Sequence, residues 1–153
     1  VYTAEGLIYF YAVLMDVVAY KNLPYGMRSH YVVADYCMLR NGLDLQYAPK
    51  HIRSDYRCCL HAVWDNGLAL EYVDDDAEVR KNRDIVRIAC AENGLALQFA
   101  GIQFRRDIQI VWDAVTQDGR ALQYAEEEMK ADEEVVLQAV QQNGRALQFA
   151  SEE

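Results

Sequence analysis

Hydrophobic residues recur along this chain with the spacing of one helix face. Four times, an Asp or Asn is followed by apolar side chains three, four, seven and eight positions later. After Asp55 these side chains are Cys58, Cys59, Ala62 and Val63, and the pattern starts again at Asn82, Asp107 and Asp132, with His30 in the corresponding place earlier. This spacing is that of a 3.6-residue helix and not of a strand. It predicts a series of amphipathic helices with these residues as N-caps.

The seventh residue after each N-cap is small in every unit. It is Cys37, Ala62, Ala89, Ala114 or Ala139. A large side chain at this place would hold neighbouring helices apart, so the pattern predicts a close approach between helices here.

An Asn-Gly or Asp-Gly pair ends each helical pattern. The pairs lie at 41–42, 66–67, 93–94, 118–119 and 143–144, with spacings of 25, 27, 25 and 25 residues. Glycine just past a helix end adopts the left-handed conformation without a Cβ penalty. We therefore predict structural helix caps at Gly42, Gly67, Gly94, Gly119 and Gly144. A hairpin turn is the competing interpretation, but the helical pattern before each pair favours a cap.

A shorter apolar pattern follows each pair. It contains a Leu, an aromatic residue two positions later, and an apolar residue three positions before the next N-cap (Ile52, Val79, Phe104 or Met129). This favours a second short helix or 3₁₀ segment, and two extra residues near 74–76 lengthen one connection. Such units bury their apolar faces only by stacking. We predict an all-α fold, a short α-solenoid of about five helix–turn–short-helix repeats of about 25 residues.

The N-terminal segment, residues 1–28, is apolar and precedes the repeat domain at 29–153. Residues 5–12 align with 41–48 through Gly, Leu, Tyr and Ala, so an eroded repeat is one interpretation and a docking helix is the other. The apolar stretch 7–20 contains Asp16 and is shorter than the roughly 20 residues of a spanning helix. A buried helix is favoured over a membrane helix.

The net charge of the chain limits the classes of molecule that it is expected to bind. The chain has 153 residues, 52% of them hydrophobic, and a net charge of -9. Nucleic-acid binding needs clustered Lys and Arg, so this balance argues against it. Residues 120–153 hold eight carboxylates against three basic groups, which makes the C-terminal end the negative one.

No residue pattern in the sequence is typical of a catalytic site. Cys37, Cys58, Cys59 and Cys90 take core positions without C-x-x-C spacing, which indicates buried structural thiols and a reducing compartment. His30, His51 and His61 form no paired-ligand motif. The acidic runs 74–76 and 126–128 lack the pattern of a calcium loop and are expected to be solvated helix starts. The sequence predicts no enzyme, no metal site and no cofactor.

The phrase DEEVVLQAVQQNGRALQFASEE at 132–153 closely resembles the repeat called domain of unknown function 4116, and the resemblance covers about residues 30–153. That family is abundant in protists and algae, dinoflagellates included, occurs in some bacterial secreted effectors, and has no established activity. The resemblance implies a helical repeat. It also suggests a plastid assembly such as a photosystem, in which Tyr and His near the apolar end would contact pigments or membrane subunits.

Two series of positions change from apolar to polar along the chain. The residue after each Gly is Leu43, Leu68, Leu95, Arg120 and Arg145, and the ninth residue after each N-cap is Leu39, Trp64, Ala91, Thr116 and Gln141. Purely structural repeats would keep such positions alike, although end-capping is an alternative explanation. Exposed apolar patches mark interfaces, so we predict one in the N-terminal half at Leu7, Tyr9, Phe10, Tyr11, Leu14, Leu39, Leu43, Trp64 and Leu68.

These features favour a non-catalytic helical-repeat module for protein–protein interaction, a small scaffold or accessory subunit of a larger assembly. Other protein subunits are the expected partners, with peripheral association to a membrane complex and no transmembrane span. The expected location is the cytoplasm or an organelle interior such as the plastid stroma. One alternative is the target-recognition part of an effector or enzyme whose catalytic domain is absent here. Another is a peptide- or ligand-binding groove on the concave face.

Overall fold

Three kinds of helix alternate in the computed structural model, which describes residues 4–15 and 18–151. The side chains of residues 4, 5 and 9 lie outside this description. The longer α-helices are α1 (Ala4–Leu14), α3 (Tyr31–Met38), α5 (Tyr56–Asp65), α6 (Arg83–Glu92), α8 (Ile108–Gln117) and α10 (Glu133–Gln142). The 3₁₀ helices that follow them are η1 (Tyr20–Asn22), η2 (Gly42–Tyr47), η3 (Gly67–Tyr72), η5 (Gly94–Phe99), η6 (Gly119–Tyr124) and η7 (Gly144–Phe149). The connecting short helices are α2 (Tyr25–Arg28), α4 (Lys50–Arg53), η4 (Glu78–Lys81), α7 (Ile102–Arg105) and α9 (Glu127–Lys130).

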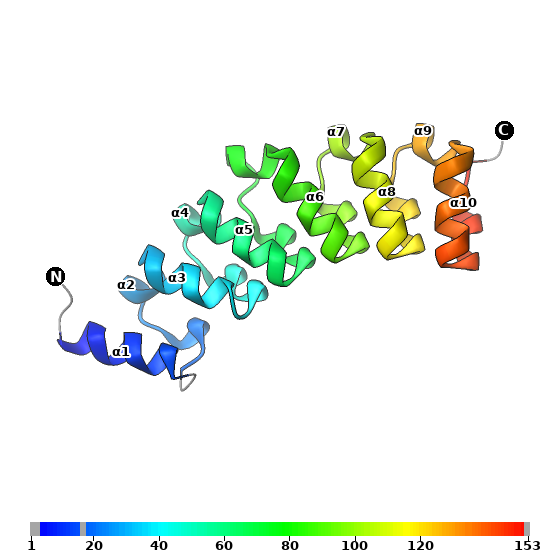
Figure 1. Ribbon diagram of the computed structural model, residues 1–153. Coiled ribbons are helices and arrows are strands. Elements are labelled where there is room, and N and C mark those ends of the chain that lie inside the picture. The colour runs from blue at the N-terminus through cyan, green and yellow to red at the C-terminus, as the bar shows by residue number, and fades with distance from the viewer. Residues whose placement is uncertain (1–3, 16–17, 152–153) are drawn as a thin grey trace.

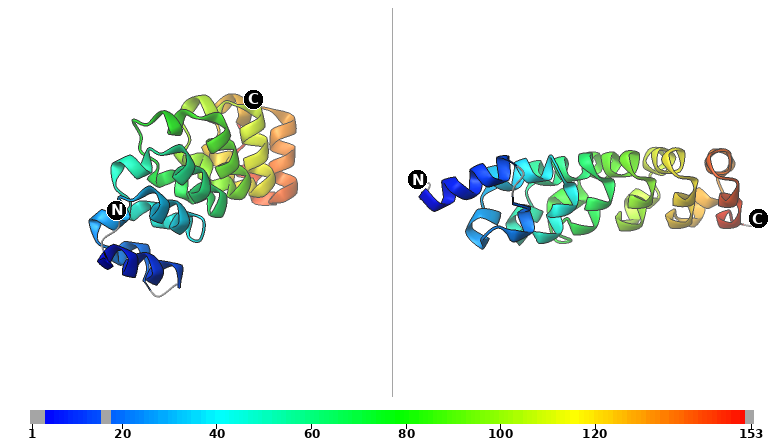
Figure 2. Two further views of the ribbon diagram at one scale, coloured as in Figure 1. Left: turned by 60° about the vertical axis from the view of Figure 1, so that its left-hand side comes forward. Right: turned by 90° about the horizontal axis from the view of Figure 1, so that it is seen from below.

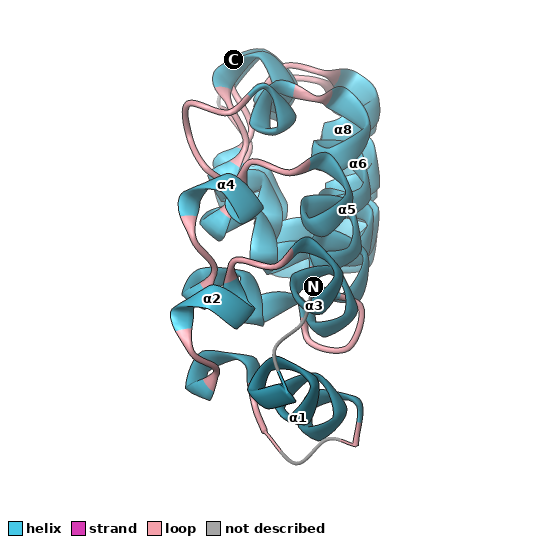
Figure 3. Cartoon of the chain, turned by 90° about the vertical axis from the view of Figure 1, so that its left-hand side faces the viewer, coloured by secondary structure: helices cyan, strands magenta, loops and turns pink. Residues whose placement is uncertain are grey.

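The units stack in sequence order into an elongated, curved array (Figure 1). The longer helices lie side by side in one row, and their axes turn gradually from α1 to α10. The 3₁₀ and short helices form a second layer, as the right-hand view of Figure 2 and the end-on view in Figure 3 show. The predicted all-α solenoid is confirmed. The second part of each unit consists of two short helices, a 3₁₀ helix followed by a separate turn of helix, and not of one.

Four of the five predicted N-caps form as expected. Asp55 accepts a hydrogen bond from the backbone N–H of Cys58, and Asn82, Asp107 and Asp132 each accept two from the first turn of their helices. His30 occupies the N-cap of α3 without a side-chain cap bond to it. An imidazole at this position does not place an acceptor oxygen over the free amides, whereas Asp and Asn do.

The apolar stripe of each longer helix forms the core, which runs continuously through the stack. At the third and seventh positions after the N-cap, residues such as Ile85, Ala89, Ile110 and Ala114 have no exposed surface. All four cysteines are buried free thiols within this core, as the sequence predicts. Each unit therefore contributes a layer of core that its neighbours cover.

The Asn-Gly and Asp-Gly pairs differ from the prediction. Asn66, Asn93, Asp118 and Asn143 end the preceding α-helix in an extended conformation, with φ near -149° to -147°, and their side chains accept the N–H two residues on. The glycine is the first residue of the 3₁₀ helix, and none of Gly42, Gly67, Gly94, Gly119 and Gly144 has a left-handed φ. The predicted left-handed glycine cap is therefore wrong, because Asn or Asp caps both helices.

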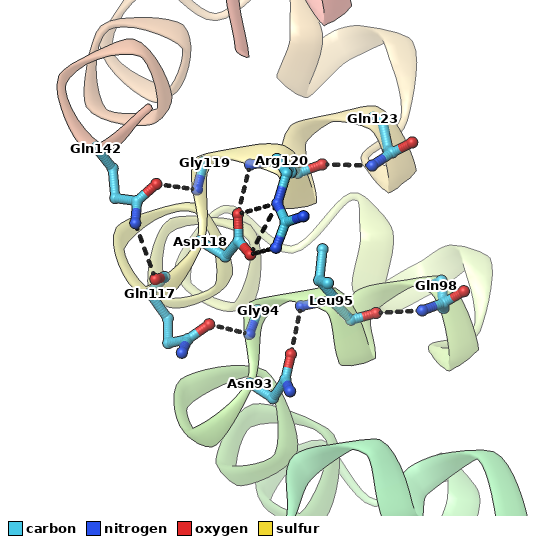
Figure 4. A network of polar contacts seen from close by, with 10 residues as sticks. All are labelled: Asn93, Gly94, Leu95, Gln98, Gln117, Asp118, Gly119, Arg120, Gln123 and Gln142. Atoms are coloured by element: carbon cyan, nitrogen blue, oxygen red, sulfur yellow. Dashed lines mark hydrogen bonds and ion pairs between the residues drawn. The ribbon is translucent and has the colours of Figure 1, made fainter. Parts of the chain in front are cut away.

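Close packing between units explains these glycines. A Cβ on Gly42, Gly67, Gly94 or Gly119 would overlap with the backbone oxygen of the small residue at position seven in the next unit, respectively Ala62, Ala89, Ala114 or Ala139. The close approach predicted at that position is thus confirmed. The glycine N–H is also used, since Gly94 donates to Gln117 Oε1 and Gly119 to Gln142 Oε1, each at 2.6 Å (Figure 4).

A row of basic residues links the units on the other layer. Arg28, Arg53, Arg105 and Lys130 end α2, α4, α7 and α9, and Arg80 is the second-last residue of η4. Arg28 Nη1 donates to the carbonyl of Tyr47 at 2.7 Å, and Arg80 Nη2 to that of Phe99 at 3.0 Å. In both pairs the carbonyl belongs to the last residue of the next 3₁₀ helix. This row recurs with the spacing of the repeat but is not among the features predicted from the sequence.

The N-terminal segment continues the same stack. Helices α1, η1 and α2 follow the order of the later units, and Val13, Tyr20 and Leu23 are buried in the common core. The alignment of residues 5–12 with 41–48 is wrong, because Gly6 lies inside α1 and does not begin a 3₁₀ helix. Pro24 precedes α2 as Pro49 precedes α4, which places this unit 25 residues before the next. Among the residues described, no helix is long and apolar enough to cross a bilayer.

Candidate protein-binding groove

An exposed apolar line runs along the outer side of α5. Tyr56, Leu60 and Trp64 are four residues apart, so they share the face opposite the buried stripe. Tyr56 is 48% and Trp64 64% exposed, while Leu60 is half-buried. Most of the surface of this indole stays in contact with solvent, and clustered exposed apolar side chains mark binding surfaces.

A groove separates this line from the next helices. Ile88 and Ala91 of α6 form its apolar opposite side, and Asp84, Arg87 and Asp113 add charged groups, with a cavity volume of about 570 Å³. Apolar walls with a few polar groups at the edge are typical of sites that bind an apolar segment and fix its orientation. We name this surface the outer groove, defined by Tyr56, Leu60, Trp64, Asp84, Arg87, Ile88, Ala91 and Asp113.

Ion pairs between units fix the positions of charged side chains in and beside the outer groove. Arg87 Nε lies 2.7 Å from Asp113 Oδ2, linking α6 to α8. Beside them, Arg83 donates two hydrogen bonds to Asp107, at 2.7 and 2.9 Å. The hydrogen bond from Arg83 and the amides that Asp107 caps lower the pKa of this carboxyl group. The carboxylate therefore remains charged at neutral pH, and the edge carries fixed charges of both signs.

A smaller hollow lies on the other side of α5. Asp35 of α3 accepts from Arg57 Nε at 3.0 Å and lies 2.6 Å from His61 Nδ1. Tyr31 and Val32 border a hollow of about 290 Å³ together with Asp35, Asp55, Arg57 and Cys58. Apolar and charged positions thus extend from the outer groove toward α3.

The predicted interface residues separate into different surfaces. Trp64 lines the outer groove. Leu39 is exposed near the end of α3, whereas Leu43 and Leu68, at the second position of their 3₁₀ helices, are half-buried and do not line the groove. The Leu-to-Arg change places Arg120 on Asp118, which it contacts at 2.7 Å within the same turn (Figure 4).

The predicted residues of α1 form a separate group. Leu7 and Tyr11 are exposed, Phe10 packs partly against the core and Leu14 is half-buried. The side chain of Tyr9 lies outside the described residues. None of these positions lines the outer groove.

Tyr56, Leu60 and Ile88 belong to this surface but are not among the interface residues predicted from the sequence. The signal was present for α5, since Tyr56, Leu60 and Trp64 follow one another at a four-residue spacing outside the buried stripe. Ile88 gave no such signal, because only the stacking of α6 on α5 brings it opposite Leu60.

The other candidate groups are part of the fold. Burial raises the pKa of Cys37, Cys59 and Cys90 to about 12, and that of Cys58 also rises, so these thiols remain protonated at neutral pH. Asp74 is buried and pairs with Lys50 at 3.5 Å, in contrast to the solvated position expected for it. Within residues 4–15 and 18–151, no cluster of His, Cys, Asp and Glu has a metal-binding arrangement.

Comparison with known proteins identifies the repeat. The family model described as Domain of unknown function (DUF4116) matches residues 82–130 and 107–153, two overlapping segments that extend from the N-cap of α6 to the end of the chain. No curated protein and no solved structure matches the chain. The predicted resemblance is confirmed over residues 82–153, where the chain matches the family described as Domain of unknown function (DUF4116), while residues 30–81 lie outside the match.

Proposed function

We propose that this chain is a non-catalytic protein-binding module, with the outer groove as its docking surface. The observation that carries the proposal is the exposed line of Tyr56, Leu60 and Trp64 facing Ile88 and Ala91 across the groove. Trp and Tyr are the side chains that most often dominate binding energy at protein interfaces. The stack supplies a rigid base, so little order is lost in the module when a partner binds.

The shape and chemistry of the groove favour an amphipathic helix as the bound segment. Its lining comes mainly from two neighbouring helices, α5 and α6, and most of the lining residues are apolar, with Asp84, Arg87 and Asp113 as the charged ones. A helix would place apolar residues at i, i+3 or i+4 and i+7 between the walls. Arg87 and Asp113 would then favour a helix that carries residues of opposite charge next to its apolar ones. A module of this kind serves as a scaffold or accessory subunit in an assembly.

Substitution of Trp64 tests the proposal. The purified chain is used to capture partners from an extract of the source cells, and the partner identified by mass spectrometry is then titrated against purified variants. Trp64→Ala is expected to weaken binding by about 30-fold, the effect of losing one anchor. Because Trp64 is 64% exposed, its removal leaves the fold intact, which circular dichroism checks.

Leu137→Ala is the matched control. Leu137 takes the same helix position on α10 as Leu60 does on α5 and is 55% exposed, but it lies outside the groove. It should bind the partner as tightly as the unmodified chain. Equal affinity of Trp64→Ala and the unmodified chain would show that the outer groove is not the docking surface.

A further inference from the structure

A cavity lies between the first two units of the stack, at the seam of α1 with α3. Its volume is about 220 Å³. A cavity of about 150 Å³ holds one benzene molecule, so this one has room for a ligand with a single ring or a short branched chain. Its lining combines apolar side chains with polar groups, chiefly Val13, Val18, Cys37, Arg40, Asn41 and Asp44. We name it the α1–α3 cavity. None of the residues that line it belongs to the outer groove.

Asp44 departs from the repeat at this cavity. The second residue after the glycine is a completely buried alanine in each later unit: Ala69, Ala96, Ala121 and Ala146. Asp44 is half-buried at the same place. In the described part of the chain its carboxylate forms no ion pair and accepts no hydrogen bond. Burial raises the pKa of this carboxyl group, and the nearby charge of Lys21 only partly opposes the rise. A carboxylate that loses solvent without gaining a partner costs free energy, and such a departure from a regular pattern is expected at a functional site.

Asn41 also departs from the repeat. The Asn or Asp at this place in the later units caps its 3₁₀ helix by accepting the N–H two residues on, but the side chain of Asn41 makes no cap bond. It lines the cavity instead, three residues before Asp44. Arg40 lies over the ring of Tyr36, with its guanidinium carbon 5.7 Å from the ring centroid. Asn41 and Asp44 therefore bring acceptor oxygens to the same cavity.

We propose that the α1–α3 cavity binds a small molecule that carries a primary ammonium group on an apolar body. The ammonium group would donate hydrogen bonds to the carboxylate of Asp44 and to Oδ1 of Asn41, and bonds between charged groups are the stronger kind. A positive charge beside Asp44 would favour its charged form. The apolar body would cover Val13, Val18 and Cys37. Burial raises the pKa of the Cys37 thiol to about 12, so this side chain stays neutral and belongs to the apolar wall.

Protein-observed NMR of the full 153-residue chain tests the proposal, with benzylamine as the probe. At neutral pH benzylamine carries an ammonium group on a single ring. It should shift the backbone amide signals of Cys37, Asn41 and Asp44 and half-saturate the cavity at about 1 mM, as expected for so small a ligand. Benzyl alcohol has nearly the same shape without the charge and should bind about tenfold more weakly, because a charged hydrogen bond is lost. Benzoate carries the opposite charge and should not bind.

Asp44→Ala and Asp44→Asn remove the charge from the cavity. Every later unit has alanine at this position, and asparagine keeps the shape of the side chain, so both variants should stay folded, which circular dichroism checks. Each should bind benzylamine about tenfold more weakly than the unmodified chain. Glu71→Gln is the matched control and should leave binding unchanged. It removes one negative charge at an exposed position outside the cavity, where the other units have Gln46, Gln98, Gln123 and Gln148.

The proposal is overturned if benzylamine gives no saturable shift at up to about 10 mM, if benzyl alcohol or benzoate binds as tightly, or if Asp44→Asn binds benzylamine like the unmodified chain. Equal weakening by Glu71→Gln would also overturn it. A general attraction of amines to a chain with a net charge of -9 would then explain the binding.

Discussion

At the scale of single residues, the glycines show how much of this fold depends on the neighbouring unit. Gly119 and Gly144 share the same local setting, since each starts a 3₁₀ helix after an Asx cap and neither has a left-handed φ. They differ in what lies beyond them. A Cβ on Gly119 would overlap with the backbone of Ala139, whereas one on Gly144 would meet nothing within 4 Å.

This pair gives a matched prediction. Gly119→Ala should lower the free energy of unfolding by about 1–3 kcal/mol, the usual cost of overpacking, because α10 must move away. Gly144→Ala should leave it unchanged or raise it by about 0.5 kcal/mol, because alanine restricts the unfolded chain. Urea unfolding of both variants and the unmodified chain measures the difference. Equal destabilisation by both substitutions would mean that local conformation, and not the next unit, requires glycine.

The same glycines show where sequence reasoning reached its limit. The Asn-Gly spacing correctly marks the end of each α-helix, and the small residue at position seven correctly indicates close packing. The same Asn-Gly sequence can form a left-handed glycine cap, or an extended Asn followed by a Gly that packs against the next unit. Only the position of Ala62, 20 residues after Gly42 in the chain, distinguishes them.

At the scale of elements, the basic residues in the last turn of the short helices connect one unit to the next. Arg80 donates to the carbonyls of Leu70, Val73 and Phe99, at 2.8, 2.6 and 3.0 Å. It thereby joins η3, the turn after it and η5, across the connection that is two residues longer than the others. Its side chain is largely buried, so solvent does not replace these bonds when the guanidinium is lost.

Arg80→Ala should therefore destabilise the chain by about 3 kcal/mol, since three acceptors lose a charged donor. Arg80→Lys should recover only part of this loss, because an ammonium cannot reproduce the planar arrangement of donors. Thermal and urea unfolding measure both. Lys81→Ala is the control, because Lys81 is exposed and, among the described residues, pairs only with Glu78 three residues before it, so its effect should stay within about 0.5 kcal/mol. Equal effects of Arg80→Ala and Lys81→Ala would remove the structural role assigned to Arg80.

Prediction from sequence succeeded for the longer helices, which repeat, and failed for the outer groove, whose residues do not. The longer helices and their caps appear in four or more copies, and the buried stripe identifies each one. The outer groove is lined by residues that do not follow the repeat pattern. Its walls come from α5 and α6, whose exposed residues differ from those of other units, so the repeat pattern carries no information about it.

At the scale of the whole molecule, the stack distributes its titratable core groups over several units. Cys37 lies in α3, Cys58 and Cys59 in α5, and Cys90 in α6, all buried. Burial disfavours the thiolate, which raises the pKa of each thiol in the folded chain above its value in the unfolded chain. Because these thiols are buried in the core, the stability of the folded chain is expected to depend on pH in the alkaline range.

The sign of this sensitivity follows from proton binding. Below about pH 9 the thiols are protonated in both states and contribute no pH dependence. Between about pH 9 and about pH 12 the unfolded chain releases their protons while the folded chain retains those of Cys37, Cys59 and Cys90. The free energy of unfolding should then fall by about 1.4 kcal/mol per pH unit for each thiol.

Cys90→Val isolates one of these contributions. Valine occupies the same position in α5 and α8, as Val63 and Val115, so the substitution suits the core and should change stability at pH 7 by less than about 1.5 kcal/mol. Above pH 9 its stability should fall less steeply than that of the unmodified chain, by the slope of one thiol. Tyr20, whose pKa burial also raises, is common to both chains and cancels in the comparison. Urea unfolding at intervals from pH 7 to pH 11 measures both slopes. Parallel curves would show that Cys90 loses its proton as readily in the folded chain as in the unfolded one, and that the core at α6 is open to water.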